Sequence, residues 1–184
     1  MQTADFLLLA YDSLGGEIKG STNLQKKIYF LALMLNEDLG YDAHFYGPYS
    51  AQVASANREL KSLGFVQEII ASARCVDQRG FEIARHDFTL TADGKAVAEI
   101  LSRRHKDKAF KIQEAATRLQ ALAHLDYMQL SIAAKAYILL GQHGGSARVS
   151  DLVGKARDFN WQLNEDDIQQ AAQSLQEIGL ASVN

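Results

Sequence analysis

The sequence predicts a mainly α-helical protein with one small β-hairpin, and three observations support this fold class. Apolar residues recur at helical spacing over residues 51–63, and Gly64 follows where a left-handed helix cap belongs. Two runs rich in branched and aromatic residues, 65–74 and 80–90, come next and flank a turn signal at 77–80. In a winged helix-turn-helix, the recognition helix is followed in this order by a glycine and by a β-hairpin called the wing. The sequence therefore predicts a winged helix-turn-helix.

Bulk composition is that of a globular protein without a general affinity for nucleic acid. The chain has 184 residues, 47% of them apolar and 22% charged, with a net charge of −3. Any nucleic-acid surface must therefore be a local patch. Cys75 is the one cysteine, and no signal peptide or membrane-spanning apolar run is visible. We expect a cytoplasmic protein that does not enter a membrane.

The first half reads as helices separated by glycine stops. A helix over residues 3–14 ends at Gly15, and a second helix begins near Leu24, after candidate caps at 21–23, and stops at Gly40. Ser50 is the N-cap of the helix over 51–63, and Thr91 caps a helix over 93–101. Lys26 and Lys27 lie in a first helical turn, where cations are disfavoured. Their ammonium groups are either solvated or form part of a site that binds an anion at the start of the helix.

The second half is predicted to be helical throughout. Residues 103–124 form one or two connecting helices, and further helices follow over 127–140, 148–157 and 165–178. Asn164 and Asp167 form an acidic variant of the capping box. The segments Leu60–Val66 and Leu175–Ala181 have a similar pattern, because each predicts the end of a helix, a glycine and an apolar strand.

We therefore divide the chain into three parts. Residues 1–101 are the winged-helix domain and residues 102–126 are a connecting helix. Residues 127–184 are a helical region, for which a second, wing-poor winged-helix-like unit is the more specific interpretation.

Four blocks of the first half carry a resemblance to known families. They are Leu24–Leu31, His44–Ser50, Leu60–Phe65 and Leu90–Gly94. Over residues 3–101 the chain resembles the YwgA-like family and, more distantly, the SocA-like (Panacea) domain of the winged-helix superfamily. The first resemblance implies a cytoplasmic prokaryotic protein of poorly defined role. The second implies antitoxins and protease adaptors, which work by binding proteins. Neither family implies catalytic residues.

No pattern in the sequence points to catalysis. The five histidines lack metal-ligand spacing, and Cys75 has no cysteine partner. Phosphate-binding glycine loops, zinc-protease motifs and nucleophile elbows are missing as well. We therefore predict no enzyme, no catalytic residue, no metal site and no cofactor.

Two hypotheses for function remain, and the first is a DNA-binding transcriptional regulator that acts as a dimer. The helix over 51–63 would enter the major groove while the wing and a C-terminal helix reach phosphates. The candidate contacts are Gln52, Ser55, Arg58, Lys61, Arg74, Arg79, Arg85, Arg148, Lys155 and Arg157. An ordinary solvated face is the alternative, which Glu59, the acidity of this half and Asp77 at the wing tip favour.

The second hypothesis is a protein-interaction module, such as an antitoxin or a protease adaptor, that uses the same fold without DNA. Its candidate partner-binding residues are Tyr41, Phe45, Tyr46 and Tyr49, because tyrosine is common in protein interfaces. Core packing around the turn at Gly47–Pro48 is the alternative for this cluster.

Overall fold

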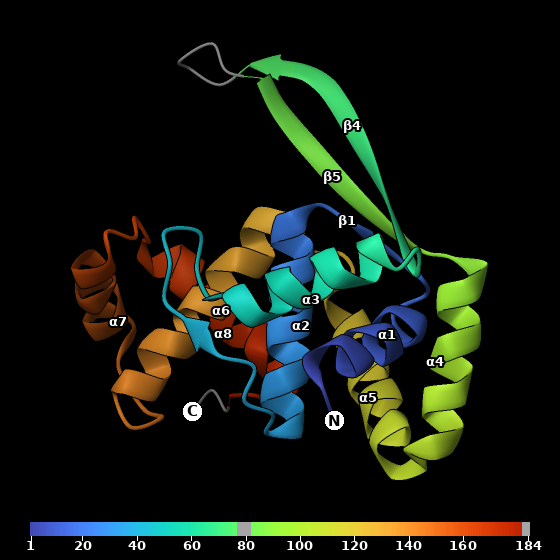
Figure 1. The fold of residues 1–184 in the computed structure, drawn as a ribbon. Coiled ribbons are helices and arrows are strands. Elements are labelled where there is room, and N and C mark those ends of the chain that lie inside the picture. The colour runs from blue at the N-terminus through green and yellow to red at the C-terminus, as the bar shows by residue number, and fades with distance from the viewer. Residues whose placement is uncertain (77–81, 182–184) are drawn as a thin grey trace.

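The computed structural model describes residues 1–76 and 82–181 (Figure 1). This part of the chain is mainly helical with a small antiparallel sheet, so the predicted fold class is confirmed. The elements in chain order are α1 (Thr3–Ser13), β1 (Glu17–Lys19), α2 (Ser21–Leu35), β2 (Tyr41–Asp42), β3 (Tyr49–Ser50), α3 (Ala51–Ser62), β4 (Val66–Val76), β5 (Glu82–Leu90), α4 (Ala92–Arg104), α5 (Lys106–Leu119), η1 (Gln120–Leu122), α6 (Tyr127–Gln142), α7 (Val149–Ala156), η2 (Arg157–Phe159) and α8 (Glu165–Glu177).

The helix, the glycine and the two hairpin strands around α3 form as predicted, while the predicted turn at 77–80 lies outside the described residues. Ser50 caps α3, since its Oγ accepts a hydrogen bond from the Val53 N–H at 3.0 Å. Gly64 ends the helix with φ at +76°, a conformation that favours glycine. β4 and β5 then pair antiparallel from Val66 opposite Leu90. The hairpin projects away from the helical body (Figure 1).

A short strand that the sequence did not reveal joins this hairpin. β1 pairs antiparallel with β5, with Ile18 opposite Phe88, and the sheet order in the described residues is β1-β5-β4. Three residues are too few for an alternating pattern to show, which is why the sequence missed β1.

Two predicted helix ends are wrong. α2 begins at Ser21 and closes at Asn36, which adopts the left-handed conformation (φ +53°), so Gly40 is not its stop. Asparagine tolerates this conformation better than most residues with a side chain. α6 continues through Gly141 to Gln142, because one helical glycine costs only about 1 kcal/mol.

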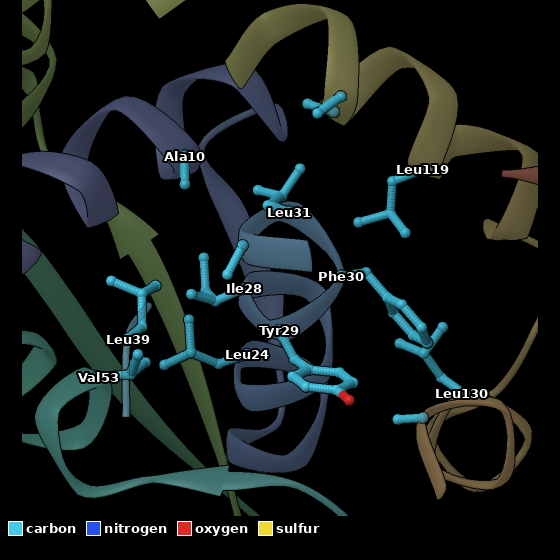
Figure 2. Close-up of a cluster of buried hydrophobic side chains, with 14 of the residues drawn as sticks. Ala10, Leu24, Ile28, Tyr29, Phe30, Leu31, Leu39, Val53, Leu119 and Leu130 are labelled. Atoms are coloured by element: carbon cyan, nitrogen blue, oxygen red, sulfur yellow. The ribbon is translucent and has the colours of Figure 1, made fainter. Parts of the chain in front are cut away.

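The core is organised around α2. Figure 2 shows Leu24 and Ile28 facing Leu39 and Val53, while Phe30 on the same helix points toward Leu119 and Leu130. α2 therefore packs against α3 on one side and against α5 and α6 on another. A buried hydrogen bond ties α3 to α1, since the Tyr11 hydroxyl donates to Asn57 Oδ1 at 2.8 Å.

The C-terminal helices pack on one another and on η1. α8 contacts both α6 and α7, and the Asn164–Asp167 capping box forms as predicted, with both hydrogen bonds at 2.9 Å. Gly179 adopts a positive φ after α8, as Gly64 does after α3. The Arg118 guanidinium donates to the Ile178 carbonyl and links α5 to this end of the chain. The division into three parts stays a prediction.

Candidate interaction surface

An exposed aromatic loop leads directly into α3. Residues 43–48 connect β2 to β3, and their turn is closed by backbone hydrogen bonds between His44 and Gly47 at 2.8 and 3.2 Å. The Phe45 and Tyr46 side chains are each 61% exposed and Tyr49 is 41% exposed. We call Phe45, Tyr46 and Tyr49 the aromatic surface. Large exposed apolar groups on one loop are typical of a site that binds another molecule.

Three buried side chains hold this loop from the protein interior. The carbonyls of His44, Tyr46 and Pro48 each accept a hydrogen bond from a different part of the chain. The donors are Trp161 Nε1 to His44 at 2.9 Å, Ser131 Oγ to Tyr46, and Lys26 Nζ to Pro48 at 2.7 Å. The loop backbone is thus fixed at every second residue, which presents the aromatic side chains in one arrangement.

Lys26 is the ionisable member of this set. Its side chain belongs to α2, and the residue is only 2% exposed. Burial, together with the nearby Lys135 ammonium, lowers the pKa of Lys26 to about 8. Of the two alternatives for Lys26, the solvated one is therefore wrong. Lys26 instead fixes the loop that precedes α3.

The four predicted partner-binding aromatics divide into two groups. Tyr41 is half-buried, donates from its hydroxyl to the Gln25 carbonyl at 2.9 Å and meets the Tyr29 ring edge-on at 5.0 Å. Burial raises the pKa of Tyr41, and core packing is its role. Phe45 and Tyr46 instead meet edge to face at 5.0 Å in solvent. Tyr49 lies 5.6 Å from the His44 ring.

The outer face of α3 begins next to the aromatic surface. Gln52, Ser55 and Arg58 are exposed on it, as the DNA hypothesis requires. Lys61 is not free, because its Nζ lies 2.6 Å from Glu68 Oε2, and the other oxygen of that carboxylate contacts His86 Nδ1 at 2.8 Å. The hydrogen bond from Lys61 lowers the pKa of Glu68, so the carboxylate stays charged and offsets Lys61.

Three of the six remaining predicted cations are also paired with carboxylates. Arg85 binds Asp87 with Nη2–Oδ2 at 2.9 Å, Lys155 binds Asp158 at 2.7 Å, and Arg148 lies 3.4 Å from Asp151. Arg157 begins η2. Arg74 belongs to β4, and Arg79 lies outside the described residues. In the described structure, Phe45 and Tyr46 thus lie together on one loop, whereas several of the predicted cations are offset by carboxylates.

Sequence reasoning missed the role of the three donors that hold the loop. Ser131 and Trp161 lie 85 and 117 residues from the carbonyls that they bind, so no local pattern could connect them. Lys135 completes the contact, with Nζ 5.4 Å from the centre of the Trp161 ring. The available signal was the single tryptophan, whose N–H needs a partner when buried.

Within residues 1–76 and 82–181, histidine, cysteine and carboxylate side chains do not gather in groups of three or more that could hold a metal ion. None of the helices in the described ranges is long and apolar enough to cross a membrane.

Comparison with known proteins gives a likeness over part of the chain. No family model matches the chain. Over 55 residues, 29% of this chain, it is 46% identical to the uncharacterized protein YwgA of Bacillus subtilis (strain 168). The match covers 33% of YwgA, so the chain spans about a third of the length of this curated relative. The YwgA-like resemblance is supported over this stretch, while the SocA-like and winged-helix relationships stay predictions.

Proposed function

We propose that the protein is a non-enzymatic protein-interaction module and that its aromatic surface is the docking site. The observation that carries this proposal is a loop with exposed Phe45 and Tyr46 whose backbone is held at alternate carbonyls. A surface fixed before binding loses little conformational entropy when a partner docks. Aromatic side chains supply a large share of the affinity in protein interfaces.

The charges of the molecule support a protein partner over a polyanion. Lys61, Arg85 and Lys155 each lie within 3 Å of a carboxylate oxygen, and the net charge is −3. Phosphate binding would need cations that are not already offset. The SocA-like resemblance supports the same choice, because it implies antitoxins or protease adaptors.

The aromatic surface gives a direct prediction for partner capture. We expect the double variant Phe45→Ser, Tyr46→Ser to lose at least about 30-fold in partner affinity, because a central aromatic typically contributes about 2 kcal/mol or more. The matched control is Phe110→Ser, Tyr127→Ser, which removes two similarly exposed aromatics on α5 and α6. Affinity capture from the source cells, followed by titration of the captured protein, measures both variants. A partner held equally well by the double variant would contradict the proposal.

A DNA-binding transcriptional regulator, cytoplasmic and dimeric, is the second candidate. It is favoured by the exposed Gln52, Ser55 and Arg58 on the outer face of α3, which is followed by a projecting hairpin. Glutamine and arginine have the geometry to read adenine and guanine edges in the major groove.

Binding to mixed duplex DNA over a salt series tests this second candidate. We expect an affinity that falls with rising salt, and Arg58→Gln should weaken binding by about tenfold. Arg104→Gln, which removes an exposed arginine at the end of α4, should have a smaller effect. No affinity for DNA at low salt would remove this candidate.

A further inference from the structure

A cleft with an apolar wall lies between the start of α2 and the turn that joins α5 to α6. Its volume is about 350 Å³, at the lower end of the range for pockets that hold small molecules. Figure 2 shows Phe30 of α2 pointing toward Leu119 and Leu130, which both line the cleft. Lys27 lies three residues before Phe30, on the same face of the helix, and also lines the cleft. The apolar lining includes five leucines: Leu14, Leu119, Leu122, Leu125 and Leu130.

The charged residues that line the cleft are Glu17, Lys19 and Lys27, which together carry one net positive charge. Lys19 Nζ lies 3.8 Å from Glu17 Oε2, so these two charges offset each other. Within residues 1–76 and 82–181, the Lys27 ammonium has no carboxylate within 4 Å and donates no hydrogen bond to another residue. Burial lowers the pKa of Lys27, because part of the water around its charge is lost and no counterion replaces it. A bound anion would offset this cost.

We propose that this cleft binds a small amphipathic acid, whose carboxylate pairs with Lys27 while its apolar chain packs against the leucines. An inorganic anion would leave the leucines uncovered, and a neutral apolar molecule would leave the ammonium without a counterion. A molecule that carries both parts matches both features of the cleft. The proposal selects, for Lys27, the anion-binding alternative that the sequence left open. The cleft shares no residue with the aromatic surface, so this proposal is independent of the proposed docking function.

Titration of the full chain with hexanoate, hexanol and hexylammonium, followed by amide chemical shifts in NMR spectra, tests the class of ligand. Hexanoate should bind with a dissociation constant on the order of 1 mM and shift the amides of residues 119–125. Hexanol should bind at least about tenfold more weakly, because it cannot pair with the ammonium. Hexylammonium should bind more weakly still, because Lys27 repels it. Absence of hexanoate binding, or equal affinity for hexanoate and hexanol, would overturn the proposal.

Substitution of Lys27 tests the charge that the ligand meets. Lys27→Gln should weaken hexanoate binding by about tenfold or more, whereas Lys27→Arg, which keeps the positive charge, should stay within about threefold of wild type. Lys135→Gln is the matched control, because Lys135 is a half-buried lysine of α6 whose pKa burial also lowers and which does not line this cleft. Unchanged affinity in Lys27→Gln, or an equal loss in Lys135→Gln, would contradict the assignment to Lys27.

A bulky side chain at the rim of the cleft tests where the ligand lies. Ala123 is exposed and lines the cleft, so Ala123→Phe should fill part of the space and weaken hexanoate binding by about tenfold or more. Ala121→Phe is the control, because Ala121 is equally classed as exposed, lies two residues earlier and does not line the cleft. Far-UV circular dichroism and thermal melting confirm that each variant folds. Hexanoate binding to Ala123→Phe with wild-type affinity would place the ligand elsewhere and overturn the proposal.

Discussion

Replacement of Gly94 by alanine is expected to lower the free energy of unfolding by about 3 kcal/mol. A Cβ at this position would lie 2.1 Å from the Phe65 carbonyl oxygen and 2.9 Å from both Phe65 C and Leu90 Cδ1. Two of these atoms are backbone and cannot rotate away, so α4 or the start of β4 must shift. Urea denaturation of the wild-type and variant proteins measures the loss.

The tight contact at Gly94 follows from how α4 begins. Thr91 Oγ1 accepts from the Gly94 N–H at 3.0 Å and donates to the Gly64 carbonyl at 2.8 Å, and the Thr91 N–H donates to Phe65. These bonds press the first turn of α4 against the end of α3. Gly154→Ala is the control, because a Cβ there would meet no atom within 4 Å and alanine favours helix by about 1 kcal/mol. Equal stability of Gly94→Ala and wild type would contradict the claim that no room exists for a Cβ at this position.

Stability is expected to rise between pH 8 and pH 10 because of Lys26. The pKa of Lys26 is about 8 in the folded protein and 10.5 when unperturbed. Below pH 8 both states hold the proton, and the buried charge costs stability. As the pH rises, the folded state loses its proton first, the unfolded chain binds more protons, and the free energy of unfolding increases. The full gain is about 3 kcal/mol.

Denaturant titrations at several pH values check this prediction. Lys26→Met should remove most of the rise, whereas Lys27→Met, one residue along α2 with a pKa that burial also lowers, should remove less of it. Burial raises the pKa values of Tyr11, Tyr29 and Tyr41, so the unfolded state ionises first above pH 10 and stability should then fall. A flat profile in wild type from pH 8 to pH 10, or an equal rise in Lys26→Met, would contradict the role of Lys26.

The sequence predicted those parts of the fold that depend on local chemistry. Helix capping by Ser50, Gly64 and Thr91 depends on backbone groups within a few residues, and the helix starts and stops that they predict are present. Whether a side chain points into the core or into solvent depends instead on residues that are distant in the sequence. Tyr41 and Phe45 look alike in the sequence, but contacts with Tyr29 and Gln25 take Tyr41 into the core. Nothing local could separate the two.

The pairing of the predicted DNA contacts could have been foreseen in part. Asp151 and Asp158 lie three residues after Arg148 and Lys155, a helical spacing at which ion pairs form. Asp87 lies two residues after Arg85, on the same face of a strand. The Lys61–Glu68 pair could not have been foreseen, because it depends on how β4 leaves α3.

The way the aromatic loop is held has a consequence for truncated forms of the chain. Every residue that would touch a partner there belongs to the first fifty, but Ser131 and Trp161 restrain the loop from the other end of the sequence. A fragment that stops after residue 101 would keep the three rings of the aromatic surface but lose two of the three side chains that donate hydrogen bonds to the loop backbone. Its loop would sample many shapes, and recognition would weaken although no contacting side chain had been altered.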